Sequence, residues 1–428
     1  MAHLLISPAR RRRTGAAALL ALTVALPSLA AAQGEPPGDA DDHARQVGHV
    51  LYVESNVARA GQNAILAYRI GLNGSLHPLI GSPFLTGGTG YYDNSFKLGP
   101  FDNDQNVILN GDRSILYAVN GGSNTIAALR LDRDGTPTPL PGSPFAAGGS
   151  TPVSLGLHRN TLVTVDSAED PAQTTANGGK PALPKLSVSR VGFDGRLALE
   201  PYASATLPAG SNPTQALTTS TGPFVFSAEF PGGGNLLSFY QAPDGRLIPA
   251  DKVALPLVSG TQALPLGLWT HPAAPYLYVG FANPDPALNK VGVYTWDDAG
   301  RLRFIRAASN SGGATCWIRS SRDGRRLYTS NTADQSVSVY DSSDPANPVE
   351  IQHLAAGGVG GYEEISLDPE ERFLYVLEQE NNAASVGKSG KVHVLRIDER
   401  SGLLTALDNL TITLPLPPNT RPLGLAIR

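Results

Sequence analysis

The chain has 428 residues, 41% hydrophobic and only 16% charged, with 46 glycines, 35 prolines and one cysteine. The hydrophobic share excludes wholesale disorder, and a single cysteine excludes an intramolecular disulfide framework or a zinc site built on several thiolates. Length alone suggests two or three domains. Abundant glycine and proline with few charges disfavour a helical bundle and favour short strands joined by tight turns.

Residues 1–32 are predicted to be a secretory signal peptide. A basic run at 10–13 precedes an apolar stretch at 16–26, and small residues at 30–32 supply a cleavage site. The apolar stretch is too short for a comfortable membrane span. Its removal leaves 29 basic and 37 acidic residues, a net charge of −8, which opposes binding to nucleic acid or anionic lipid. We expect a periplasmic or secreted protein with no membrane span after cleavage, and a flexible leader at 33–46.

A short apolar strand, commonly ending in a polar residue, then recurs along the chain. The copies are Leu51–Val53, Leu116–Asn120, Leu162–Asp166, Phe224–Phe226, Leu277–Val279, Leu327–Asn331 and Leu374–Glu378. From Tyr52 to Tyr375 the chain takes 323 residues over six steps, a mean near 54. Each copy is followed by an alternating strand and then, in most copies, by a turn such as Asp134-Gly135. A repeat of this length predicts one four-stranded unit per copy.

The repeats predict an all-β fold, a seven-bladed β-propeller of four-stranded antiparallel blades that forms one domain at 47–428. Twisted blades around an axis bury each other's faces and leave only short edges. The last strand, Pro422–Ile427, matches inner strands such as Pro265–Leu268, whereas the first repeat lacks an inner strand. We therefore expect the C-terminal strand to close the ring.

Two long interruptions are predicted to be loops. Residues 85–106 join the first and second blades, and residues 167–184 lie between the second and third strands of the third blade. Long loops in a compact repeat fold often carry binding, although a plain insertion is the commoner explanation.

The amino-acid sequences of the repeats resemble those of the seven-bladed lactonase family, which includes 6-phosphogluconolactonases and 3-carboxymuconate-lactonising enzymes. The matching segments are Ile115–Asn120, Leu129–Gly135, Ile318–Asn331, and Gly81–Phe84 with its copy Gly142–Phe145. The resemblance spans about residues 47–428. It implies the propeller fold and lactone hydrolysis by a His, Arg and carboxylate set at one mouth of the channel.

Several positions depart from the family pattern. Trp317 and Thr332 stand where the family usually has Glu and Arg, and neither Pro152 nor Pro213 is followed by the expected His. A Glu-Ile pair does occur at Glu364-Ile365, one blade later.

Strand geometry gathers a different set at that mouth, where the inner strands start and the second strands end. Its members are Asp102, Asp104, Gln215, Glu229, Trp317, Arg319, Glu363, Glu364, Glu378 and Arg421. Glu364 or Glu229 is the predicted general base. Arg319 and Arg421 are predicted to hold an anionic substrate, with Trp317, Asp104, Gln215 and Glu363 completing the binding set.

Other interpretations remain open for the same residues. Arg319 could lie under Trp317 and pair structurally with a glutamate, and Cys316 is expected to be buried packing. No cofactor and no metal is predicted, although Asp102 and Asp104 offer the oxygen ligands that Ca²⁺ prefers. Two hypotheses follow: a hydrolase of a lactone or sugar-acid derivative, or a non-catalytic monomer that binds a small molecule, a glycan or a protein.

Overall fold

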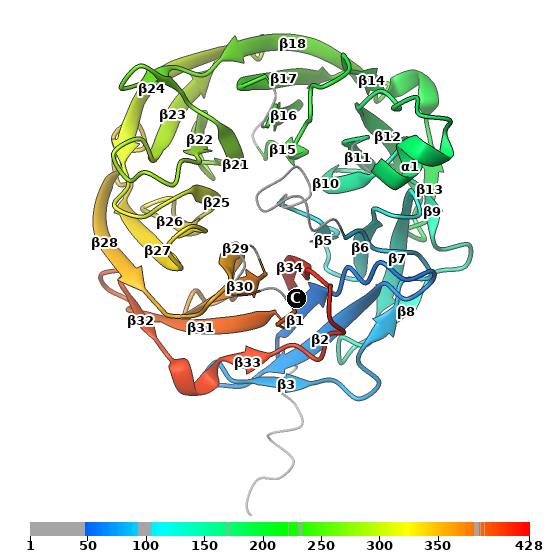
Figure 1. Cartoon of the computed structure of the whole chain (residues 1–428), viewed down its shortest axis with the longest axis horizontal. Coiled ribbons are helices and arrows are strands. Elements are labelled where there is room, and N and C mark those ends of the chain that lie inside the picture. The colour runs from blue at the N-terminus through cyan, green and yellow to red at the C-terminus, as the bar shows by residue number, and fades with distance from the viewer. Residues whose placement is uncertain are drawn as a thin grey trace, which may run out of the picture. The chain divides into compact units, whose positions relative to one another are not determined.

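The computed structural model describes residues 48–92, 104–168, 171–220, 222–230, 233–380, 385, 387–388 and 390–428. The signal peptide and leader predicted at 1–32 and 33–46 lie outside these residues, as does Asp102. Within the described residues, antiparallel sheets follow one another around a ring (Figure 1). The fold is a seven-bladed β-propeller, which confirms the prediction from the repeats.

The innermost strand of each blade lines the central channel. In blade order, these strands are β34 (Leu423–Ile427), β5 (Val107–Leu109), β10 (Pro152–His158), β15 (Leu217–Thr218), β21 (Pro265–Thr270), β25 (Thr315–Ser320) and β29 (Gly361–Leu367).

The second strands carry the recurring apolar motif. They are β1 (Val50–Glu54), β6 (Ile115–Asn120), β11 (Thr161–Asp166), β16 (Phe224–Ala228), β22 (Tyr276–Phe281), β26 (Arg326–Asn331) and β30 (Phe373–Gln379). These strands are buried along almost their whole length. Because a neighbouring blade covers each face, the sequence reads as a continuous apolar run rather than as an alternation.

The third and outermost strands complete each blade. The third strands are β2 (Ala64–Ile70), β7 (Thr125–Leu131), β12 (Lys185–Val191), β17 (Asn235–Gln241), β23 (Lys290–Trp296), β27 (Ser336–Asp341) and β31 (Lys391–Ile397). The outermost strands are β3 (Leu76–Pro78), β8 (Pro137–Pro139), β13 (Leu197–Leu199), β18 (Leu247–Ala254), β24 (Leu302–Ser309), β28 (Val349–Ala355) and β32 (Leu404–Ala406). In four blades a short extra strand continues the outer edge: β4 (Phe84–Leu85), β9 (Phe145–Ala146), β14 (Ala205–Thr206) and β33 (Ile412–Thr413).

The C-terminal strand closes the ring, as expected. In the first blade, β1 pairs antiparallel with β2 on one side and with β34 on the other. The register places Leu51 opposite Ile427 and Tyr52 opposite Ala426. One blade is therefore made from both ends of the propeller, which removes a free sheet edge.

In five of the seven blades, the tyrosine of the recurring motif bonds the blade to the next one. The Tyr52 hydroxyl donates to the Gly135 carbonyl at 2.7 Å, and the Tyr117 hydroxyl donates to the Gly195 carbonyl at 2.8 Å. Tyr278, Tyr328 and Tyr375 make the same kind of bond to a turn of the following blade. The motif thus supplies both core packing and a directional bond between blades.

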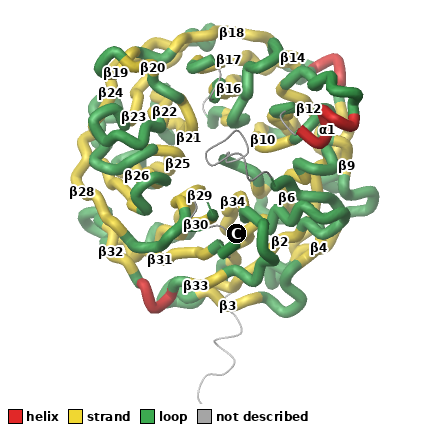
Figure 2. Tube along the Cα trace, viewed as in Figure 1, coloured by secondary structure: helices red, strands yellow, loops and turns green. Residues whose placement is uncertain are grey.

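Helical structure is confined to short segments outside the blades' cores (Figure 2). The predicted loop at 167–184 does lie between β11 and β12, and it contains the helix α1 (Pro171–Ala176), which the sequence did not indicate. Two 3-10 turns (Pro201–Ala203 and Asp408–Leu410) and a hairpin of β19 (Leu257–Val258) and β20 (Thr261–Gln262) complete the elements. Within the described residues, no helix combines the length and apolar character that a membrane crossing requires.

Candidate functional site

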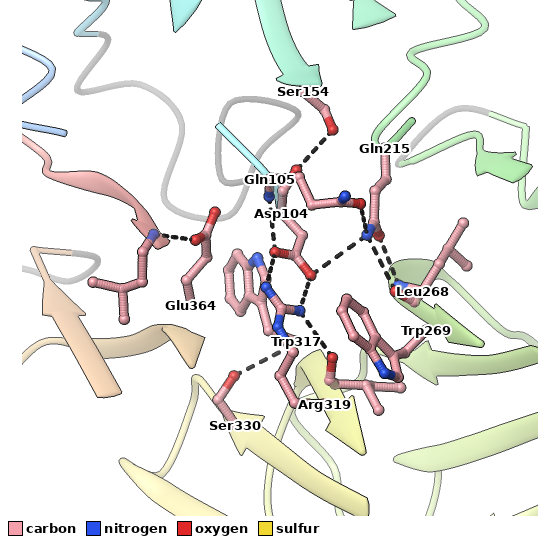
Figure 3. Close-up of polar contacts among 12 residues, drawn as sticks. Asp104, Gln105, Ser154, Gln215, Leu268, Trp269, Trp317, Arg319, Ser330 and Glu364 are labelled. Atoms are coloured by element: carbon pink, nitrogen blue, oxygen red, sulfur yellow. Dashed lines mark hydrogen bonds and ion pairs between the residues drawn. The ribbon is translucent and has the colours of Figure 1, made fainter. Parts of the chain in front are cut away.

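A buried ion pair between Asp104 and Arg319 lies at the centre of the candidate site (Figure 3). Arg319, near the end of β25, donates from Nη1 to Asp104 Oδ2 and from Nη2 to Asp104 Oδ1, the latter at 2.6 Å. Asp104 is 2% exposed and Arg319 is 9% exposed. The two residues are 215 positions apart, so only the closing of the ring brings them into this bidentate geometry.

Asp104 is also held by neighbouring blades. Its carbonyl oxygen accepts a hydrogen bond from the Ser154 hydroxyl on β10 at 2.7 Å. The Gln215 amide, just before β15, donates to Gln105 Oε1 at 2.7 Å and to the Leu268 carbonyl on β21 at 3.1 Å. In return, the Leu268 N–H donates to Gln215 Oε1 at 2.8 Å. These bonds link the second, third, fourth and fifth blades across the channel.

Some N–H donors of the Arg319 guanidinium are not used by Asp104. Its plane lies 4.3 Å from the Trp269 ring centroid, a cation–π contact. Besides the two bonds to Asp104, Nη1 donates to the Ile318 carbonyl at 2.9 Å. A guanidinium has five N–H donors, so two of them make no hydrogen bond to a described residue. Burial alone would lower the pKa of Arg319, but the charge and hydrogen bonds of Asp104 raise it above its usual value.

Glu364 on β29 lies beside this ion pair. Its carboxylate accepts a hydrogen bond from the Leu425 N–H on β34 at 2.5 Å, and the residue is 1% exposed. Burial, followed by the negative charge of Asp104, raises the pKa of Glu364 well above its ordinary value. The charge of Arg319 offsets only part of that rise.

Glu54, at the end of β1, is a second buried carboxyl in this environment, and sequence reasoning missed it. Its Oε1 accepts a hydrogen bond from the Asn63 amide at 2.7 Å, and the residue is fully buried. Burial raises its pKa well above the ordinary value, and the charge of Glu364 adds to the rise. The signal was available, because Glu54 occupies the position that Val119 and Val165 hold in the next two blades, so a charged residue interrupts an otherwise apolar strand.

The remaining predicted residues have different surroundings. Trp317 is fully buried in an apolar cluster, and its indole N–H has no hydrogen-bond partner in the part of the chain that the structure describes. Glu363 is fully buried as well. Arg421 lies with its guanidinium 5.9 Å from the Tyr92 ring centroid, and the Tyr92 hydroxyl donates to Glu380 Oε1 at 2.7 Å.

Glu229 does not contact the Asp104–Arg319 pair. Its carboxylate oxygens bind the Lys252 ammonium at 2.9 Å and the Asn235 amide at 2.5 Å. Lys252 belongs to β18, the outermost strand of the fourth blade, so this glutamate is held by its own blade. Cys316 is fully buried, and its thiol donates to the Ala314 carbonyl at 3.1 Å.

The partner of Arg319 is thus Asp104, and the aromatic ring in cation–π contact with it is Trp269, a residue not singled out from the sequence. Among the described residues, no group of three or more His, Cys, Asp and Glu side chains is arranged to hold a metal ion. Asp102, the other calcium ligand considered, lies outside the described residues.

The fold and this cluster define the class of protein: a seven-bladed β-propeller whose channel carries buried carboxyls and an arginine. The model of the family described as lactonase, 7-bladed β-propeller, matches residues 288–417. That segment contains Trp317, Arg319, Glu363 and Glu364. The chain thus resembles the lactonase family over this segment and has the seven-bladed fold that its repeats indicated.

Several solved structures are similar to this chain in fold. A periplasmic gluconolactonase from Pseudomonas aeruginosa is 16% identical, with a TM-score of 0.62, over 88% of this chain and 99% of that one. A Bacteroides uniformis protein described as a candidate 6-phosphogluconolactonase is 18% identical, with a TM-score of 0.64, over 90% and 100% of the two chains. A Lactobacillus plantarum protein has 16% identity and a TM-score of 0.66 over 89% and 99%. The search of curated proteins finds no match.

Proposed function

We propose that this protein hydrolyses a lactone or a related sugar-acid ester in its channel. The observation that supports this most is Glu364, a buried carboxyl with a strongly raised pKa beside Arg319. Carboxyls tuned in this way are typical of general acid–base sites. The match of residues 288–417 to the lactonase family model and the names of the structural neighbours favour the same class of substrate.

In this proposal the chemistry needs two groups. Ionised Glu364 takes a proton from the attacking water as the water oxygen bonds to the lactone carbonyl carbon. The unused N–H donors of Arg319 stabilise the oxyanion that forms on the carbonyl oxygen. Collapse of this intermediate breaks the ring C–O bond, and protonated Glu364 returns its proton to the leaving oxygen.

The experiment is a turnover assay with aldonolactones and aryl lactones on the purified protein. Arg319→Ala is expected to lower kcat/KM about 100-fold or more, and Glu364→Gln by a similar or larger factor. Arg303→Ala on the exposed face of β24 is the matched control and is expected to leave turnover unchanged. Because Glu364 must lose its proton to act as base, kcat/KM is expected to rise with pH. Full activity in Glu364→Gln would refute the role given to this residue.

One observation favours the non-catalytic alternative. Asp104 binds Arg319 through both carboxylate oxygens. The surrounding hydrogen bonds connect several blades, as expected of a cluster that only stabilises the fold. In that case the protein binds a small molecule, a glycan or a protein without turnover. Saturable binding with no hydrolysis across the lactone panel, lost when the 85–106 loop is shortened, would favour this alternative over hydrolysis.

We also propose that the protein is exported to the periplasm or beyond. The basic and apolar pattern of residues 1–32 supports export, and one structural neighbour is described as periplasmic. Mass spectrometry of the protein recovered from a cell fraction would test this. An N-terminus near Gln33 in the exported fraction is expected, and an intact Met1 in the cytosolic fraction would contradict it.

A further inference from the structure

A cavity that is separate from the Asp104–Arg319 cluster lies between the third and fourth blades. Its volume is about 560 Å³, within the usual range for small-molecule sites. It is bounded by the β10–β11 turn, the β15–β16 turn and the β17–β18 turn. None of the residues of the Asp104–Arg319 cluster lines it.

Two donors in this cavity, on Gln241 and Arg159, are available to a ligand. Gln241, at the end of β17, is 7% exposed, and its Nε2 has no hydrogen-bond partner among the described residues. Arg159 is exposed on the β10–β11 turn and forms no ion pair with any described acidic residue. A buried amide donor without a partner costs free energy unless a ligand or water satisfies it.

The charge of the cavity favours an anion. Of the described residues that line it, Arg159 carries the full positive charge and none is acidic. Burial, and next the charge of Arg159, lowers the pKa of His158, and a hydrogen bond to the Thr219 backbone offsets part of that shift. In a chain whose net charge is −4, a cavity without carboxylates is suited to a ligand that carries one.

An aromatic ring forms another wall. Tyr240 is half-buried and packs edge-on against Phe224, with ring centroids 6.1 Å apart. Its packing fixes the ring orientation, and its apolar face is the kind of surface on which the C–H face of a pyranose stacks. Asn160 and Thr161 add short polar side chains to the rim.

A smaller cavity of about 310 Å³ continues from the first one. The two share Asn160, Thr161, Pro243 and Gly245. The smaller cavity extends to Tyr202, which is 61% exposed. The smaller cavity is also lined by Glu200 and Asp244, each of which is ion-paired with an arginine, Arg190 and Arg246 respectively. Together the cavities form an elongated polar groove with an aromatic ring in each part.

We propose that this groove binds an acidic saccharide. Arg159 holds the carboxylate of one uronic acid unit by charge-assisted hydrogen bonds. Gln241 Nε2 donates to an oxygen of the same unit, and the pyranose face stacks on Tyr240. The next unit extends toward Tyr202. This site is independent of the proposed hydrolysis in the channel.

The test is calorimetric titration of the full-length mature protein with glucuronate, glucose and trigalacturonate. Glucuronate is expected to bind in a 1:1 complex, glucose at least about 10-fold more weakly, and trigalacturonate more tightly than glucuronate. Arg159→Ala is expected to raise the Kd for glucuronate by about 10- to 100-fold and to leave glucose binding unchanged. Arg113→Ala is the matched control, because Arg113 is exposed on the corresponding turn of the second blade with a similar φ of 56° against 54°.

The outcomes separate cleanly because Arg159 is exposed and its loss does not disturb the core. No saturable binding of either acidic probe would overturn the proposal. Binding that Arg159→Ala and Arg113→Ala weaken equally, or that neither weakens, would place the ligand elsewhere and overturn it too. Selective loss in Arg159→Ala would support it.

Discussion

Asp166 offers a quantitative test of how a buried carboxyl behaves between the blades. This residue ends β11, is fully buried, and accepts a hydrogen bond from the Ser187 hydroxyl at 2.5 Å. Burial raises its pKa from 3.8 to about 8, and the Ser187 bond and the charge of Lys185 offset only part of the rise. The folded protein thus keeps a proton at pH 7 that the unfolded chain releases.

The sign of the pH effect follows from this difference. Because the folded pKa is raised, the stabilising contribution of the proton is complete below pH 3.8 and is lost as the pH rises toward about 8. Over that window the free energy of unfolding falls by up to about 1.4 kcal/mol per pH unit. Between pH 5 and pH 8 the loss is therefore about 4 kcal/mol. For a domain of roughly 380 residues this corresponds to about 5 °C in Tm.

Asp166→Asn removes the titration with little change of shape. The sister residue in the sixth blade is already an asparagine: Asn331 ends β26, and its amide donates to the Ser338 hydroxyl at 3.0 Å. Ser338 occupies the register position that Ser187 has in the third blade. A loop glycine packs against the side chain in both blades, Gly149 on Asp166 and Gly312 on Asn331. An amide therefore fits this position.

The assay is thermal unfolding of the wild type and Asp166→Asn at half-unit steps from pH 5 to pH 8. The Tm of the variant minus that of the wild type is expected to increase by about 5 °C across this range. Asp298→Asn, in the exposed β23–β24 turn, is the control, and its difference is expected to stay flat. A flat difference for Asp166→Asn as well would show that Asp166 is ionised in the folded protein and would refute the reasoning.

Three further predictions concern pairs and contacts of the described residues. Asp104→Ala leaves Arg319 buried without its partner and is expected to cost about 3–5 kcal/mol in chemical denaturation; a loss below 1 kcal/mol would mean that another group pairs with the arginine. Glu378 accepts hydrogen bonds from His393 and from the Val359 and Gly360 N–H groups, and these bonds bring its pKa to about 2 against the effect of burial. Glu378→Gln is therefore expected to be less stable than the wild type at pH 6, and the difference in stability is expected to close as the pH falls from 4.5 toward 2. A difference that persists at pH 2 would contradict this. Tyr117→Phe removes the bond to the Gly195 carbonyl and is expected to lower stability by about 1–3 kcal/mol, whereas Tyr202→Phe, on an exposed side chain, serves as the neutral comparison in the same urea titrations.

The blades could be predicted from the sequence because each one repeats the same pattern of apolar strand and turn. Leu116-Tyr117 and Leu327-Tyr328 recur because every second strand is covered on both faces, and in five of the seven blades the tyrosine of the motif reaches the next blade. The match between Pro422–Ile427 and other inner strands also predicted that the C-terminal strand closes the ring. The first blade lacks an inner strand of its own, and the C-terminal strand fills that position. The helix at 171–176 was not predicted, since its short polar segment has no apolar periodicity.

The candidate site was predictable only as a set of residues at strand ends. Glu364 and Arg319 were named because their strands reach the channel, and both lie in the cluster. Glu229 was named on the same ground, yet its carboxylate binds Lys252 on its own blade. Periodicity places a residue on a strand but does not say which of several nearby charges its side chain will bind.

Sequence alone determined the number of blades and the strand that closes the ring, because both depend on patterns that are local and repeated. Which charges meet was decided only by the tertiary structure. Asp104 and Arg319 are 215 residues apart, and their bidentate contact depends on the curvature of a complete ring. Burial in that ring, a property of no single segment, is also what raises the pKa of Glu364 and makes it a candidate for chemistry.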